Sequence, residues 1–207
     1  MPKRLSESAI QQYREEGYYF PIRVLETDEA AACRTQLETF EKSQGEVVAG
    51  PLRSKAHLLF KWVDNVMRKD TVLDAVEDLI GPDILCWNTF FWNKEARSDS
   101  FVSWHQDATY WGLNSQEVTT AWIALTDSTI ENGCMRVVPG THCDPIHEHV
   151  DTFAENNQLS RGQEIAVSVN EDDAVDLILK AGEMSLHHVN LIHGSNANET
   201  DGKRIGY

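Results

Sequence analysis

The sequence predicts an α+β fold in a single domain, with helices in about residues 1–82 and a β core in about residues 83–207. Two observations carry this prediction. Apolar residues recur with a helical period up to Ile80, and from Ile84 onward short aromatic-rich stretches alternate with turns. A chain of 207 residues is also long enough to bury one sizeable core.

The first element is expected to be a helix through the segment AIQQYREE. Ser6 or Ser8 would cap its start and Gly17 would end it, because serine accepts from free helical N–H groups and glycine adopts left-handed backbone. The segment YYFPIRV then predicts a short strand interrupted by Pro21.

Two further helices are expected before the β core. One would start at a cap formed by Thr27 or Asp28 and run to about Ser43. The other runs through TVLDAVEDLI, where apolar residues line one face, and ends at Gly81-Pro82. The segment GEVVAGPLR between them is expected to be a loop.

The second part of the chain predicts strands without intervening helices. The strand-like stretches are 84–94, 118–127, 134–142, 174–195 and 203–207. Such an arrangement favours an antiparallel sandwich or barrel, and we expect a jelly-roll-like body.

Composition excludes several classes of partner. The net charge of −15 argues against a nucleic-acid or anionic-membrane surface. No stretch approaches the roughly 18 apolar residues of a membrane span, and the N-terminus lacks the apolar run of a signal peptide. Four scattered cysteines without a CxxC pair predict reduced thiols and a cytoplasmic location.

The segment SWHQDATYWGL holds two potential metal ligands, His105 and Asp107. In a strand, residues i and i+2 project from the same face, so an imidazole and a carboxylate would reach the same ion. The tripeptide alone is a weak signal, and an ordinary polar bend is the alternative.

A second segment, LHHVNLIHGS, supplies three histidines, His187, His188 and His193. His193 stands at the end of an apolar strand and before the small residues Gly and Ser, which leave room for a ligand. With His105 and Asp107 it completes two histidines and one carboxylate, the facial triad of non-haem Fe(II) oxygenases. A structural zinc site would instead favour four closed ligands, often with thiolate.

Arg204 follows His193 by eleven residues, across the turn-like segment NANETDG. We expect the two residues to lie on adjacent strands. Arginine binds carboxylates bidentately and keeps its charge, so Arg204 would hold the far end of an iron-chelating dicarboxylate. A surface arginine in a charged loop is the alternative interpretation.

The order of the motifs WHQD, GCMRVVPGTH and HGSNAN followed by Arg204 resembles the phytanoyl-CoA dioxygenase family over about residues 6–207. The resemblance implies a double-stranded β-helix fold, an Fe(II) cofactor and 2-oxoglutarate as cosubstrate. By position it implies that His105, Asp107 and His193 bind iron and that Arg204 binds the distal carboxylate of 2-oxoglutarate. His187 and His188 are alternatives to His193, but neither is followed by the GSxxN pattern. Trp122 would line the cosubstrate pocket, or serve only as a core aromatic.

The segment ILCWNTFFWNK is also similar to the halogenase branch of this family, whose members replace the ligand carboxylate with alanine. Because Asp107 is present, the resemblance implies hydroxylation of a small organic molecule by O2, with release of succinate and CO2. The alternatives are a non-catalytic metal-binding protein and a zinc hydrolase.

Other candidates carry weaker signals. Asn88 and Thr89 are expected either to hydrogen-bond the cosubstrate or to line the pocket. Lys55 and His57 would face the substrate or only punctuate a loop, and we favour the loop interpretation. His142, in PGTH, is expected to be structural. Four aromatic residues would wall a substrate channel or belong to core and rim: Phe101, Trp104, Tyr110 and Trp111.

The sequence given ends at Tyr207, three residues after Arg204, whereas members of the family run on. A truncated frame and a naturally short protein are both compatible with this end. The resemblance implies that a last strand and a C-terminal segment are missing. We therefore expect an unpaired sheet edge and a frayed terminus that places Arg204 poorly.

Overall fold

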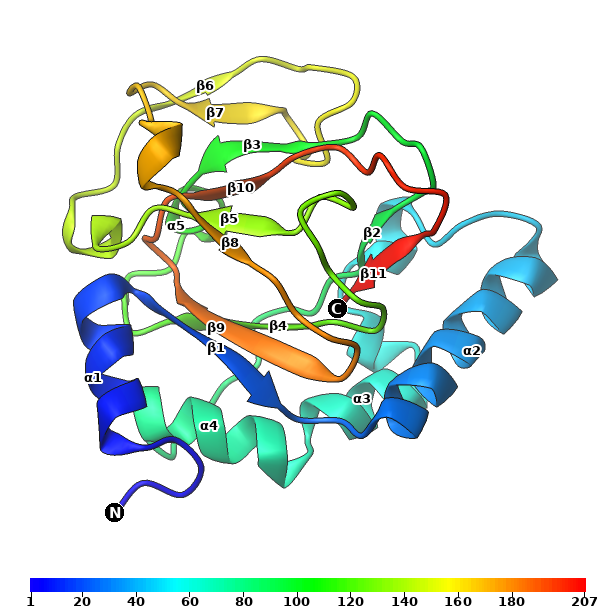
Figure 1. Ribbon diagram of the computed structural model, residues 1–207, viewed down its shortest axis with the longest axis horizontal. Helices are drawn as coiled ribbons and strands as arrows, with labels where there is room; N and C mark the ends of the chain where they lie inside the picture. Colours follow the sequence, from blue (N-terminus) through cyan, green and yellow to red (C-terminus); the bar gives the residue numbers. More distant parts are fainter.

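Two antiparallel β-sheets form the body of the protein, with helices packed against one of them (Figure 1). The structure is a computed structural model that describes the backbone of residues 1–207 and every side chain except those at positions 50 and 51.

The first sheet has the order β1 (Tyr18–Arg23), β9 (Glu183–His188), β4 (Thr119–Ile123). The second has the order β3 (Val102–His105), β10 (His193–Ser195), β5 (Met135–Val137), β8 (Val175–Leu177). Two further pairs join β11 (Arg204–Gly206) to β2 (Trp92–Lys94) and β6 (His149–Asp151) to β7 (Gln163–Ile165).

The helices lie mostly in the first 80 residues. They are α1 (Glu7–Glu16), α2 (Thr27–Gln44), α3 (Lys61–Met67), α4 (Asp70–Ile80) and the short α5 (Ala108–Trp111). Four 3₁₀ turns complete the set: η1 (Gly50–Arg53), η2 (Ala56–Leu58), η3 (Thr141–Cys143) and η4 (Glu171–Asp173). No helix of the described chain is long and apolar enough to cross a membrane.

The predicted helix boundaries are confirmed for α1 and α4. Ser6 caps α1 by accepting from the N–H of Ala9, and Gly17 ends it in the left-handed conformation at φ +84°. The predicted cap of α2 is wrong, because Thr27 already lies inside the helix. Glu26 holds the cap position, and the carboxylate of Glu29 accepts from its N–H at 2.9 Å, which satisfies a free helical donor.

The division into a helical and a β part is only approximate. β1 pairs with β9, so the N-terminal part contributes an edge strand, and it continues past Pro21 with an irregular register between Tyr19 and Ile22. Conversely, the aromatic stretch 84–91 is not a strand. Its backbone makes only isolated hydrogen bonds, such as the one that the N–H of Lys55 donates to the carbonyl of Thr89 at 2.8 Å. The composition of residues 84–91 predicts a strand, but Trp87 and Phe90 line a cavity and Phe91 is buried in the core instead.

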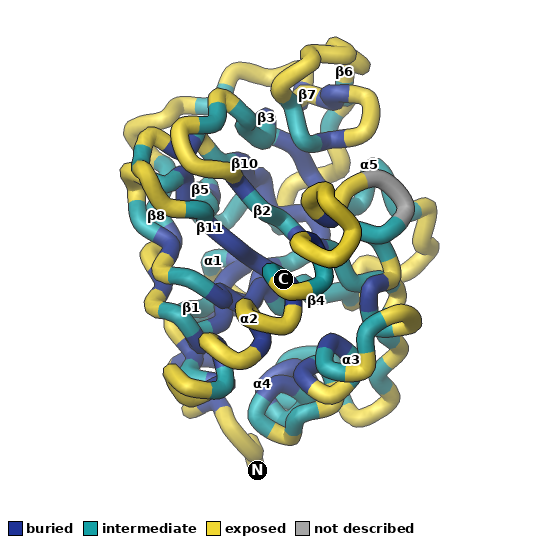
Figure 2. The backbone as a smooth tube through the Cα atoms, turned by 90° about the vertical axis from the view of Figure 1, so that its right-hand side faces the viewer, coloured by how far each residue is buried: buried dark blue, intermediate teal, exposed yellow. Residues whose placement is uncertain are grey.

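The core has two layers, which Figure 2 shows as buried segments running through the centre of the molecule. Val72 and Val76 of α4 pack in one cluster with Ile123 and Leu186 of the first sheet. Between the sheets, Tyr18 of β1 packs with three apolar residues of the other layer: Val137, Leu177 and Leu191. Each fully buried side chain of this size contributes about 1.5–3 kcal/mol, so these layers fix how the sheets lie.

The last residues of the chain are well held, contrary to the expected fraying. In β11, Arg204 pairs with Lys94 and Gly206 with Trp92, and Gly206 also bridges to Ala124. Tyr207 exchanges two backbone hydrogen bonds with Ile123, at 2.7 and 3.0 Å. β11 therefore has a partner on each side, and its residues are buried.

Candidate functional site

His105 and His193 are brought together by direct strand pairing. The two residues are register partners in β3 and β10, and their ring centroids lie 4.1 Å apart. Both side chains are buried. The two segments are nearly ninety residues apart in the chain, so only the pairing of β3 with β10 joins them.

Asp107 reaches the same point by a different route from the one predicted. It lies after the end of β3 in helical backbone (φ −58°, ψ −36°), at the start of α5, so the argument from strand alternation is wrong. The turn into α5 instead directs the carboxylate of Asp107 toward the two imidazoles. Its Oδ1 lies 3.5 Å from Nε2 of His105 and 4.0 Å from Nε2 of His193.

Backbone carbonyls orient both imidazoles. Nδ1–H of His105 donates to the carbonyl of Ser103, and Nδ1–H of His193 donates to that of Leu191, each at 2.9 Å. This fixes Nε2 as the free nitrogen on both rings, which is the usual support of a metal-binding histidine. Burial lowers the pKa of His193 to about 3, so the ring is neutral and ready to ligate.

The donor set fits a divalent transition metal. One ligand atom from each of His105, Asp107 and His193 lies within 4.8 Å of the others. Burial opposes ionisation of Asp107, yet the imidazoles of His105, His193 and His187 around it hold its pKa below the ordinary range. Two imidazoles and one carboxylate on one side match a site that leaves positions open for other ligands.

A third histidine, His187, borders this cluster. It faces Thr120 across β9 and β4, and its Nε2 lies 3.9 Å from Oδ2 of Asp107. Thr120 also donates to that oxygen at 3.3 Å. His188 points the other way, as alternation in a strand requires, and its ring lies 5.3 Å from that of His142.

Arg204 and Trp122 lie in the same cavity as the three candidate ligands. The guanidinium is stacked 5.3 Å above the indole ring, and both side chains are buried. Arg204 and His193 are not on adjacent strands as expected, because β11 pairs with β2 whereas β10 lies in the second sheet. The surface-loop alternative for Arg204 is wrong.

Lys94 is a residue that the sequence reasoning missed. It is the register partner of Arg204, is fully buried, and donates to Oγ of Ser195 at 2.7 Å. Burial and the charge of Arg204 lower its pKa to about 6. The available signal in the sequence was a lysine that directly follows an aromatic, strand-like stretch. A lysine buried in such a place is rare unless it is paired.

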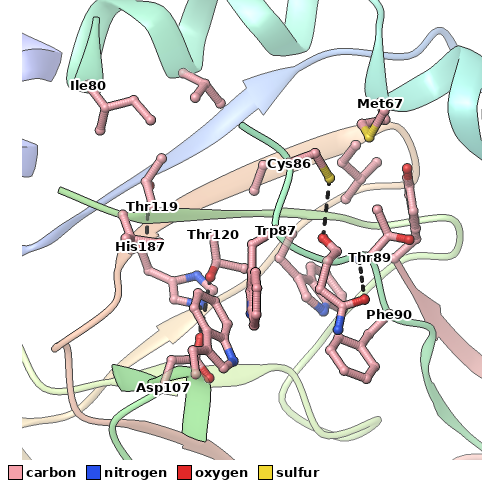
Figure 3. A pocket seen from close by; sticks show the side chains of 18 of the residues that line it. Met67, Ile80, Cys86, Trp87, Thr89, Phe90, Asp107, Thr119, Thr120 and His187 are labelled. Atoms are coloured by element: carbon pink, nitrogen blue, oxygen red, sulfur yellow. Dashed lines mark hydrogen bonds and ion pairs between the residues drawn. The ribbon is translucent and has the colours of Figure 1, made fainter. Parts of the chain in front are cut away.

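The cavity has a volume of about 450 Å³, in the range of small-molecule sites. One end holds His105, Asp107, His193 and Arg204. The other is walled by α4 and by the stretch from Ile84 to Phe90 (Figure 3). Asp107, Thr120 and His187 lie close together at the polar end in this view.

Asn88 and Thr89 line the cavity, but their polar atoms are engaged within the chain. Asn88 accepts from the N–H of Lys55 at 2.9 Å, and the Thr89 hydroxyl lies 2.9 Å from Nδ1 of His57. The geometry thus favours a lining role over hydrogen bonds to a cosubstrate. Lys55 and His57 hold the adjoining loop, as expected.

The predicted aromatic channel is only partly formed. Trp111 lines the cavity, whereas Phe101, Trp104 and Tyr110 do not. Trp104 instead packs against Arg136, whose guanidinium carbon lies 5.4 Å from the ring. His142 contacts the carbonyl of Arg14 at 3.1 Å, which suits the structural role expected for it.

Comparisons with known proteins agree on one family. The family model described as phytanoyl-CoA dioxygenase matches residues 2–206. A probable alpha-ketoglutarate-dependent hypophosphite dioxygenase of Stutzerimonas stutzeri is 30% identical over 81% of this chain and 60% of its own length. The peroxisomal phytanoyl-CoA dioxygenase of Homo sapiens is 31% identical over 64% of this chain and 40% of its own.

Solved structures of two non-heme enzymes are also similar to this chain. The non-heme monooxygenase ThoJ, in its apo form, is 36% identical with a TM-score of 0.84, over 96% of this chain and 74% of that one. The alpha-ketoglutarate-dependent carbocyclase SnoK from nogalamycin biosynthesis is 27% identical with a TM-score of 0.76, over 100% and 84%. The chain spans between two fifths and three fifths of the two curated relatives named above.

Proposed function

Because the chain belongs to the phytanoyl-CoA dioxygenase family, we propose that it is an Fe(II)- and 2-oxoglutarate-dependent dioxygenase that hydroxylates a small organic molecule. The observation that carries the proposal is the convergence of two Nε2 atoms and one carboxylate in a buried cavity. His105, Asp107 and His193 bind the iron in this proposal. Fe(II) with 2-oxoglutarate and O2 supplies the oxidation, and CO2 and succinate are released.

Arg204 binds the distal carboxylate of 2-oxoglutarate. Its guanidinium is buried in the cavity that holds the three proposed ligands, and Trp122 fixes it by stacking. A buried guanidinium favours a carboxylate partner because an unpaired buried charge is costly. Trp122 also forms an apolar side of the cosubstrate site.

The protein residues orient the reactants and exclude water. The carbonyls of Ser103 and Leu191 hold the two imidazoles, and Thr120 holds the carboxylate of Asp107. The apolar wall from α4 excludes water from the part of the cavity that lies beyond the three proposed ligands. Positioning of this kind is the contribution that a protein makes to cofactor chemistry.

We also infer that the two sheets form the double-stranded β-helix of the family and that residues 1–207 make one oxygenase domain. The antiparallel order of β3, β10, β5 and β8 opposite β1, β9 and β4 supports this inference. The core layer shared by the two sheets supports a single folding unit.

The carboxylate at position 107 favours hydroxylation over halogenation, because it fills the position that halogenases leave to chloride. Asp107→Ala should therefore abolish succinate release in the presence of Fe(II), 2-oxoglutarate and O2. The variant should also bind Fe(II) more weakly, since one of three ligands is lost.

The matched control is Asp172→Ala, which removes an exposed carboxylate outside the cavity. Circular dichroism would verify the fold of both variants. Equal succinate release by Asp107→Ala and the control would refute the role of Asp107.

A further inference from the structure

The part of the cavity beyond the proposed iron site has a lining that selects by charge. We propose that the substrate is a predominantly hydrocarbon molecule without negative charge, bound between α4 and the stretch from Ile84 to Phe90. This inference rests on the proposed function and specifies the substrate class of the same site.

The wall of this part is mainly apolar and comes from three segments. α4 contributes Val72, Val76 and Ile80, and the segment after it contributes Leu85 and Trp87. Trp111, the last residue of α5, and Leu113 just after it form a third side of the wall. Such a surface binds hydrocarbon or aromatic groups, since each buried methylene contributes about 0.8 kcal/mol.

Three polar side chains of the wall have partners within the chain, and one of them is Ser115, which accepts from the N–H of Glu117 at 3.1 Å. Asn88 is bonded to Ser54 and to the backbone at Lys55, and Thr89 is bonded to His57. These side chains leave the hydrocarbon contacts to dominate recognition.

Charge distinguishes the two ends. Among the described lining residues, Arg204 is the one lysine or arginine, and in the proposed function 2-oxoglutarate occupies it. Two exposed carboxylates, Asp83 and Glu117, lie at the outer part of the lining. Lys55, whose ammonium lies 6.0 Å from the Trp87 ring, belongs to the rim and not to the lining.

A carboxylate or phosphate group would therefore pass the carboxylates of Asp83 and Glu117 and the ammonium of Lys55 at the rim. Inside the described lining it would meet no lysine or arginine other than the occupied Arg204. Desolvating an unpaired anion in an apolar cavity is strongly unfavourable. The net charge of −15 adds to the repulsion at a distance. An uncharged hydrocarbon molecule meets neither cost.

The test uses two ligands of nearly the same shape, 4-phenylbutanamide and 4-phenylbutanoate, at pH 8. The full chain is loaded with Ni(II) and saturating 2-oxoglutarate, so that Arg204 is occupied and no turnover occurs. Binding is followed by tryptophan fluorescence, since Trp87, Trp111 and Trp122 line the cavity. We expect the amide to bind at least tenfold more tightly than the carboxylate.

Two double variants of equal charge change test the cause. Asp83→Lys with Glu117→Lys should reduce the preference for the amide to threefold or less. Asp172→Lys with Glu155→Lys, at exposed positions outside the lining, should leave it unchanged. A wild-type preference below tenfold, no binding of the amide, or equal effects of the two double variants would overturn the proposal.

Failure of the proposed function would look different. In that case the protein would not take up Ni(II) and 2-oxoglutarate, which calorimetry measures before any substrate is added. Omitting 2-oxoglutarate gives a further distinction, because a free Arg204 should then strengthen binding of 4-phenylbutanoate but not of the amide.

Discussion

Arg204 carries a full charge although its side chain is buried. No carboxylate of the described chain forms an ion pair with it. Its Nε also lacks a hydrogen-bond partner, and the Trp122 ring covers one face of the guanidinium. Burial lowers its pKa to about 10, which still leaves the group charged at neutral pH. The guanidinium therefore has free donors for an anion, and a dicarboxylate cosubstrate would supply that anion.

Replacing Arg204 with Leu should raise the dissociation constant of 2-oxoglutarate by about 10- to 100-fold, because hydrogen bonds to charged groups are worth about 1.5–3 kcal/mol. The dissociation constant of Co(II) should change less than twofold. Calorimetric titration of both ligands checks this, with Arg204→Lys as the variant that keeps the charge. Unchanged affinity for 2-oxoglutarate would place its carboxylate elsewhere.

Lys94 gives a prediction on pH. Its pKa falls from 10.5 to about 6 because of burial and the charge of Arg204, so between these values the unfolded chain binds one more proton than the folded chain. The free energy of unfolding therefore gains up to about 1.4 kcal/mol per pH unit from this group as pH rises from 6 toward 10.

Lys94→Met should remove this contribution and flatten the pH dependence of stability. Urea unfolding at several pH values between 6 and 9.5 measures the effect. Lys42→Met, on the exposed side of α2, is the control. Equal slopes for wild type and Lys94→Met would mean that Lys94 stays charged in the folded protein.

At the scale of the element, β11 is the strand that places Arg204, and its geometry depends on a glycine. Gly206 lies flat against the indole of Trp122, so a Cβ there would overlap the ring. β11 is also fixed at its start, where the Lys203 ammonium lies 2.8 Å from the carboxylate of Glu41 in α2. A change at Gly206 should reach Arg204 through the ring that both residues contact.

Gly206→Ala should lower the free energy of unfolding by about 1–3 kcal/mol, the usual cost of overpacking a core. Affinity for 2-oxoglutarate should fall with it. Gly202→Ala is the matched control, because a Cβ there meets no atom within 4 Å. Denaturant unfolding and calorimetry compare the two variants, and similar stability of both would contradict the packing argument.

The helices α1 and α4 could be predicted because a short, local sequence pattern determines each of them. The caps of α1 and the stripe of α4 are properties of a few neighbouring residues. The capping of α2 by Glu26 and Glu29 was not predicted, because Ser, Thr, Asp and Asn are the residues preferred at the start of a helix. The strand predicted for 84–91 is absent because β-propensity reflects packing on a pleated surface, whereas here Trp87 and Phe90 line a cavity and Phe91 packs in the core.

At the scale of the whole molecule, the candidate metal site ties together parts that are distant in sequence. Its ligands come from β3, from the start of α5 and from β10. An ion bound there interacts with the folded chain and has no such site in the unfolded one. Metal binding is therefore expected to stabilise the fold by mass action.

Co(II) at about 100 times its dissociation constant should stabilise the protein by about 2.7 kcal/mol. The thermal midpoint should rise for wild type and for Asp172→Ala, but not for Asp107→Ala. Thermal unfolding with and without Co(II) measures this. An equal rise in Asp107→Ala would show that the acidic surface, and not the triad, binds the ion.

The sequence by itself determined the composition of the site. The residue types His105, Asp107, His193 and Arg204 in their order predicted the family, because coordination and charge pairing depend on side-chain chemistry. Tertiary structure alone decided how they meet: the pairing of β3 with β10 opposes the two histidines, and the turn into α5 brings Asp107 back. It also decided that Lys94 is buried beside Arg204 and that β11 is held on both sides. These facts depend on contacts between segments far apart in the chain, which no local pattern encodes.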